Sequence, residues 1–183
     1  LVSSSAASDV YKRQVYETAL VFYKEVEDTA GQGKNMIGLG KVYEALGENQ
    51  KAKEILLKSL LINKRLGEQS VLADNMNALG EVYYSSGDYS IALNYYMLAL
   101  KNLSRKDDKN AVAIAYQGMG DSLFQMKQYP QALENLEEAL AIYKEGKKTA
   151  KVGRIYAQLG TISVAKEKPE LAVVFYKKAI NIY

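Results

Sequence analysis

The stretch NALGEVYYSSGDYSIALNYYMLAL, residues 77–100, places a glycine inside a pattern that predicts a helix. Leu79, Val82 and Tyr83 have the i, i+3, i+4 spacing of the apolar face of an amphipathic helix. Gly80 follows Leu79 directly, and a glycine inside a helix costs about 1 kcal/mol relative to alanine. A role that offsets this cost is therefore expected, and the candidates are catalytic, ligand-binding and architectural.

A repeat of 40 residues decides between these roles. A Leu-Gly or Met-Gly pair ends at each of Gly40, Gly80, Gly120 and Gly160. An alanine, a large residue and a small residue follow each glycine at constant spacing: Ala52, Leu56 and Ser59; Ala92, Tyr96 and Ala99; Ala132, Leu136 and Ala139; Ala172, Tyr176 and Ala179. Because glycine permits close backbone approach, a glycine that recurs in every repeat is expected to mark a helix contact rather than a single catalytic site.

Each repeat is expected to form two helices. The predicted turns within repeats are GENQ (47–50), GDYS (87–90), KQYP (127–130) and EKPE (167–170), and those between repeats are LGEQ (66–69), RKDDK (105–109) and EGKK (145–148). Gly47 and Gly87 are expected to end helices, and Pro169 to lie in a first helical turn. The expected organisation is a non-repeat segment 1–14, a partial repeat 15–30, and repeats 31–68, 69–108, 109–148 and 149–183.

Composition argues against several function classes. The 183 residues include no Cys, His or Trp, which excludes a Ser-His-Asp triad, a thiolate nucleophile and a Cys/His zinc site. The sequence therefore predicts no enzyme, no metal and no cofactor. The net charge of +3 is spread along the chain, so no nucleic-acid partner is expected, and no apolar run approaches the ~20 residues of a membrane span. The lack of cysteine fits a reducing compartment and favours a cytoplasmic location.

The two ends of the chain differ from the repeats between them. Residues 1–14, LVSSSAASDVYKRQ, resemble translated library-adapter sequence, and an ordinary polar tail is the alternative. Residues 170–183, ELAVVFYKKAINIY, lack a helix-ending signal and are apolar on more than one face. We therefore expect an internal piece of a longer protein.

The repeat resembles the tetratricopeptide repeat. The resemblance is carried by Met36-Leu39-Gly40-Tyr43, Met76-Leu79-Gly80-Tyr83, Tyr116-Met119-Gly120 and Tyr156-Leu159-Gly160, together with the alanine series above. The 40-residue length is similar to repeats of kinesin light chains and bacterial regulatory proteins; the usual length is about 34 residues, and the family's proline near the repeat end is absent. Ser163 also stands where the pattern has tyrosine. The resemblance implies an all-α, right-handed superhelix of antiparallel helix pairs, whose first helices line a concave groove for a peptide or protein partner.

The resemblance and helical geometry place four positions of each first helix in that groove, namely six and three residues before the glycine and one and four after it. We call the selected residues the first-helix stripe: Lys34, Lys41, Glu44, Asp74, Asn77, Glu81, Tyr84, Gln117, Asp121, Phe124, Arg154 and Thr161. The stripe is mixed in charge, and Tyr84 and Phe124 are expected to be exposed aromatics.

Three other features have weaker functional interpretations. GQGKNMIG (31–38) lacks the spacing of a phosphate loop, so an inter-repeat turn is the preferred explanation of its first two glycines. The stretch YKEGKKTAKVGR (143–154) is rich in lysine. It could bind an acidic or phosphate-bearing partner, but the preferred interpretation is a solvated turn followed by the start of a helix. The many tyrosines allow a stacking platform for single strands, but most occupy core positions of the repeat.

The sequence thus favours a non-catalytic scaffold that binds a peptide or partner protein in the groove. The alternative is a sensor or regulatory segment of a longer bacterial signalling protein with a histidine kinase, cyclase or transcription-regulator output. A helical enzyme that uses carboxylates is a third, weaker hypothesis. The pattern makes no prediction about the oligomeric state.

Overall fold

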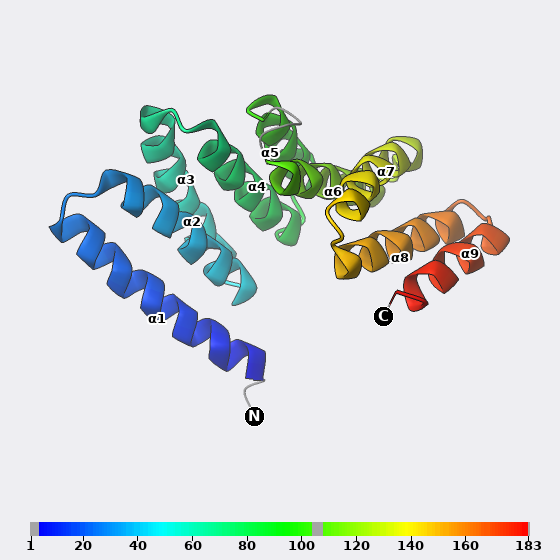
Figure 1. Cartoon of the computed structure of the whole chain (residues 1–183), viewed down its shortest axis with the longest axis horizontal. Coiled ribbons are helices and arrows are strands. Elements are labelled where there is room, and N and C mark those ends of the chain that lie inside the picture. Colours follow the sequence, from blue (N-terminus) through cyan, green and yellow to red (C-terminus); the bar gives the residue numbers. More distant parts are fainter. Residues whose placement is uncertain (1–3, 104–107, 183) are drawn as a thin grey trace. The chain divides into compact units, whose positions relative to one another are not determined.

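The computed structural model describes residues 4–103 and 108–182, and these residues form an all-α fold of nine helices without a strand (Figure 1). The helices are α1 (Ser4–Glu25), α2 (Thr29–Ala45), α3 (Asn49–Leu66), α4 (Gln69–Ser85), α5 (Tyr89–Lys101), α6 (Lys109–Gln125), α7 (Tyr129–Glu145), α8 (Thr149–Ala165) and α9 (Pro169–Ile180). The predicted turn at 105–109 lies largely outside the described residues.

The chain divides into two compact units, Leu1–Leu103 and Ser104–Tyr183. The first unit contains α1 to α5, and the second contains α6 to α9 (Figure 1). Within the units, consecutive helices pack as the pairs α2–α3, α4–α5, α6–α7 and α8–α9. Each pair contains one copy of the 40-residue pattern, with the glycine on the first helix and the alanine series on the second.

The repeated glycine faces the large residue of the second helix in every pair. A Cβ atom added to it would lie 2.5 to 2.7 Å from that side chain in the contacts Gly40–Leu56, Gly80–Tyr96, Gly120–Leu136 and Gly160–Tyr176. Real Cβ contacts are essentially never so short, so a larger residue at the glycine would force the facing side chain or the helix to shift. The expectation that this glycine marks a close helix contact is confirmed.

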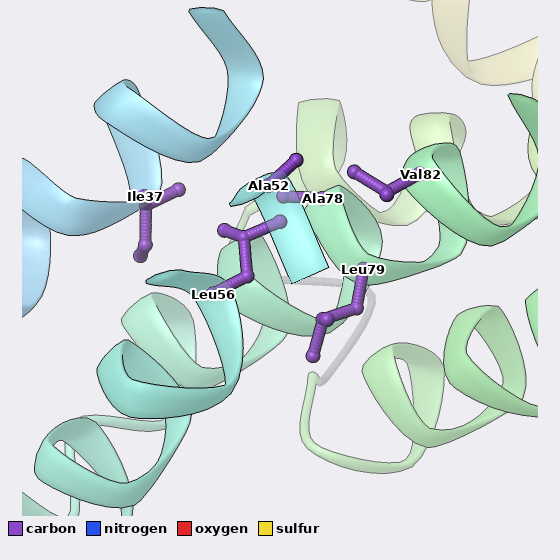
Figure 2. Close-up of a cluster of buried hydrophobic side chains, with 6 residues drawn as sticks. All are labelled: Ile37, Ala52, Leu56, Ala78, Leu79 and Val82. Carbon is purple, nitrogen blue, oxygen red and sulfur yellow. The ribbon is translucent and has the colours of Figure 1, made fainter. Parts of the chain in front are cut away.

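The first unit has a hydrophobic core where α2, α3 and α4 meet (Figure 2). The six buried side chains of this cluster come from all three helices: Ile37, Ala52, Leu56, Ala78, Leu79 and Val82. A buried Leu contributes roughly 1.5–3 kcal/mol relative to an exposed one. Since Leu56 also contacts Gly40, the contact within one pair and the packing between neighbouring pairs share a residue.

A buried polar contact occupies the small position of the first pair. The hydroxyl of Ser59 donates a hydrogen bond to the carbonyl oxygen of Gly33 at 2.8 Å, and Asn63 Nδ2 donates to Ser59 Oγ at 3.0 Å.

Gly31 and Gly33 lie in α2, so the expected inter-repeat turn at these glycines was wrong. Tyr23 packs against Gly31 and Asn63 against Gly33, at positions where a Cβ atom would clash. Close packing between helices therefore explains these glycines.

The turns within pairs have a common backbone conformation. Gly47 and Gly87 have φ of 75° and 84°, which confirms that they end helices. Lys127 and Glu167 occupy the equivalent turns with φ of 60° and 55°, although this left-handed conformation favours glycine. Pro169 is the first residue of α9, as expected.

One helix crosses the expected boundary between the non-repeat segment 1–14 and the partial repeat 15–30, and the boundary itself remains a prediction. Helix α1 extends over Ser4–Glu25 and so includes most of the segment 1–14, for which a polar tail was one of the two interpretations. Tyr16 stands 40 residues before Leu56 and so continues the large position of the repeat. A Cβ atom added to Gly38 would lie only 2.4 Å from the ring of Tyr16. Tyr43 also donates a hydrogen bond to Glu17 at 2.9 Å. These contacts fix α1 against α2.

The left-handed turn residues lead to a first prediction. Replacing Lys127 with glycine should raise the free energy of unfolding by about 0.5–1 kcal/mol, because the strain of a left-handed lysine exceeds the entropy that glycine adds to the unfolded chain. The reverse change in the equivalent turn, Gly87→Lys, should lower it by a similar amount. Urea unfolding of both variants measures the two effects, and a Lys127→Gly protein that unfolds at lower urea than the parent contradicts the prediction.

Candidate partner-binding surface

The first-helix stripe lies on α2, α4, α6 and α8, the first helices of the four pairs. Its residues are spaced by three, four or seven along each helix, so they share one helical face. In the first unit, α2 packs against α4, and Ser85 Oγ donates a hydrogen bond to Glu44 Oε1 at 2.5 Å. The stripes of α2 and α4 are therefore neighbours and form one surface.

The stripe residues differ in how accessible they are. The exposed members are Lys34, Lys41, Arg154 and Thr161, and the half-buried members are Glu44, Asp74, Glu81, Tyr84, Asp121 and Phe124. The ammonium group of Lys34 forms an ion pair with Glu68 at 2.9 Å. Lys41, by contrast, has no carboxylate within 4.0 Å in the described part of the chain. Lys41 is thus an accessible positive charge on this surface.

Two stripe residues, Asn77 and Gln117, are buried and not accessible to a partner. Only 2% of the Asn77 surface and 6% of the Gln117 surface is exposed. Gln117 Oε1 accepts a hydrogen bond from the hydroxyl of Tyr143 at 3.2 Å, so its amide points toward α7. The expectation that these two residues face an open groove is corrected, because both side chains are buried although their positions lie on the face of the stripe.

The two aromatics of the stripe are half-buried rather than exposed. The ring of Tyr84 packs against Tyr89, with ring centroids 5.4 Å apart, and Phe124 packs against Tyr129 at 5.8 Å. Both partners begin the second helix of the same pair. These rings therefore close the turn between the two helices, and only part of each faces solvent.

In the second unit, the structure brings Asp121 and Arg154 together and adds Gln158, which the sequence had not indicated. Gln158 Nε2 donates a hydrogen bond to Asp121 Oδ1 at 2.5 Å. Burial raises the pKa of the Asp121 carboxyl to about 6, while the charge of Arg154 and the hydrogen bond from Gln158 oppose that rise. Gln158 lies four residues after Arg154 and three before Thr161, on the same face of α8, and it was missed because the four chosen positions leave out the one two residues before the glycine.

Residues 4–103 and 108–182 contain no group of three or more side chains that could hold a metal ion. No helix in these residues is both long enough and apolar enough to cross a membrane.

The tetratricopeptide repeat family model matches residues 32–105 and again residues 106–183. The chain belongs to the tetratricopeptide repeat family. The two matched segments correspond closely to the two compact units, apart from α1. A comparison with curated protein sequences finds no match.

Several solved structures share the fold at low sequence identity. BtubC (BKLC) from P. vanneervenii is 20% identical with a TM-score of 0.76, over 97% of this chain and 71% of that chain. A Rap protein complexed with Competence and Sporulation Factor is 17% identical with a TM-score of 0.76, over 94% of this chain and 50% of that one. The structure of MamA from Desulfovibrio magneticus RS-1, which starts at residue 41, is 18% identical with a TM-score of 0.67, over 100% of this chain and 97% of that chain. The chain thus spans about half the length of the Rap protein.

The raised pKa of Asp121 generates the second prediction. Its ionised form is disfavoured in the folded state, so this group lowers stability above pH 6, and the loss disappears as the pH falls through 6 toward the ordinary value of 3.8. Asp121→Asn keeps an oxygen that accepts the Gln158 hydrogen bond, and should stabilise the protein at pH 7.5 by roughly 1–3 kcal/mol.

Thermal unfolding of wild type and Asp121→Asn between pH 4 and pH 8 measures this effect. The difference between the two proteins should shrink as the pH is lowered. A difference that is the same at pH 4 and pH 8 would show that the Asp121 carboxyl is not the group responsible.

Proposed function

We propose that the chain is a non-catalytic binding module that holds a peptide or protein segment on the part of the first-helix stripe that lies on α2 and α4. The observation that carries the proposal is the packing of α2 against α4, with a hydrogen bond from Ser85 to Glu44 between them, so that their stripes form one surface. That surface presents polar and charged groups from two successive repeats. A segment lying across both helices can therefore contact several of them at once.

The charges of this surface favour a particular kind of segment. Lys41 is an accessible positive charge on α2, whereas Asp74 and Glu81 are half-buried negative charges on α4. A complementary segment has an acidic residue over α2 and a basic residue over α4, and such complementarity favours specificity and association rate. The half-buried ring of Tyr84 adds an amphipathic contact at the end of α4.

The comparisons support the same class of function without defining the partner. The Rap structure, whose fold is similar, was solved with Competence and Sporulation Factor in complex. That complex is a property of the Rap protein, and here it motivates a binding role. The absence of His and Cys from the sequence supports the non-catalytic part of the proposal.

The third prediction tests this surface with peptides selected on the full chain. Peptides selected from a random 12-residue phage library should carry the acidic-then-basic pattern. Their affinity should fall at least tenfold for the Lys41→Ala, Glu81→Ala double variant, because the two removed charges lie on adjacent helices of the stripe. Isothermal titration calorimetry measures the affinity, and thermal unfolding checks that the variant is folded.

The matched control removes the same charges from the second helix of the first pair. Glu54 and Lys58 are exposed on α3, so Glu54→Ala with Lys58→Ala should leave the affinity within twofold of wild type. If this control weakens binding as much as the test variant does, the selected peptides do not recognise the first-helix stripe.

A further inference from the structure

A second charged surface lies in the second unit, on residues that the first-helix stripe does not use. We call it the lysine cluster, and it consists of five exposed lysines: Lys144, Lys147, Lys148, Lys151 and Lys178. The first four follow one another through the end of α7 and the start of α8, and the fifth comes from the last turn of α9. Three consecutive helices therefore contribute to it.

The cluster is organised by one aromatic ring. Lys144 Nζ lies 5.2 Å from the centre of the Tyr156 ring, and Lys178 Nζ lies 5.5 Å from the same centre. Tyr156 is itself held by Phe175 of α9, with ring centroids 6.3 Å apart. Contacts between an ammonium group and an aromatic ring are favourable at this range. The structure thus fixes two lysines from different helices on one ring.

The positive charge of the cluster is not neutralised within the described part of the chain. None of the five ammonium groups there has a carboxylate within 4.0 Å, and the nearby Glu145 pairs with Lys109 instead. Some lysines elsewhere do have such partners, as in the Lys51–Glu48 and Lys53–Asp88 ion pairs, whereas others, such as Lys41, have none in the described part of the chain. A single lysine at the carboxyl end of α7 or α9 is favourable, because its charge interacts with the helix dipole. This effect does not account for several positive charges that lie together without a negative partner.

We propose that the lysine cluster is a docking site for an acidic segment of a partner protein. Carboxylates of such a segment would supply the counter-charges that the cluster lacks. The proposal is independent of the function proposed for the first-helix stripe. Tyr156 lies two residues after Arg154, which is about 200° around the helix at 3.6 residues per turn, so its ring is on a different side of α8 from the stripe. Lys151, three residues before Arg154, is the one cluster member on the stripe side of α8.

The structure favours an acidic protein segment over a nucleic acid. Sequence-tolerant binding of single strands relies on aromatic faces on which bases stack. Only 9% of Tyr156 is exposed, and its ring is already contacted by two lysines and by Phe175. The chain as a whole has a net charge of only +3, which is small for a nucleic-acid binder.

The test measures fluorescence anisotropy of a labelled decapeptide of alternating glutamate and serine, titrated with the full chain in low salt. Wild type should bind saturably, and binding should weaken as salt is raised. The Lys144→Gln, Lys178→Gln variant should bind at least tenfold more weakly. Lys147→Gln with Lys148→Gln, which leaves the ring contacts intact, should also weaken binding severalfold.

The matched control is Lys58→Gln with Lys64→Gln, which removes the same charge from exposed positions of α3 and should bind within twofold of wild type. Three results would overturn the proposal. They are an absence of saturable binding to wild type, an equal loss in the α3 control, and tighter binding of a ten-nucleotide oligothymidine than of the acidic peptide.

Discussion

The contact between a glycine on the first helix and a large side chain on the second is the constraint on which this structure depends. It occurs in all four pairs, with Leu56 or Leu136 as the partner in two of them and a tyrosine in the others. Because the contact leaves no room for a Cβ atom, the large side chain of the second helix packs directly against the first helix at the glycine. This repeated contact is what allows successive first helices to present equivalent positions.

The two proposed partner surfaces follow from this arrangement. Burying one side of each first helix against its pair leaves another side for Lys41 and Glu81 in the first unit and for Asp121 in the second. The second helices carry a different chemistry, because Lys144 and Lys178 converge on a ring of α8 from its two neighbours. One repeat pattern therefore builds two kinds of surface, of mixed charge on first helices and basic where three helices meet.

The sequence predicted the parts of the fold that recur and missed those set by a single local contact. The 40-residue register was sufficient to identify the glycine contact, the helix pairs and the turns at Gly47 and Gly87. Helical spacing places Asn77 and Glu81 on one face of α4, but burial depends on what the neighbouring helices cover, so the spacing could not distinguish the half-buried Glu81 from the buried Asn77. Gln158 was missed because its position in the repeat was not among the four chosen, although it shares a face of α8 with Arg154. The spacing of residues also did not predict that the Tyr84 ring packs against Tyr89, because that contact depends on the side-chain packing at the turn.

The most direct test of this account is a double-mutant cycle between Gly80 and Tyr96, measured by equilibrium unfolding. A Cβ atom at Gly80 would lie 2.7 Å from the Tyr96 ring, so Gly80→Ala should destabilise the wild-type chain by about 1–3 kcal/mol, the usual cost of overpacking. In the Tyr96→Ala background the same change should be neutral, or stabilising by up to about 1 kcal/mol, because only helix propensity remains. A Gly80→Ala change that stabilises both backgrounds equally would contradict the central claim.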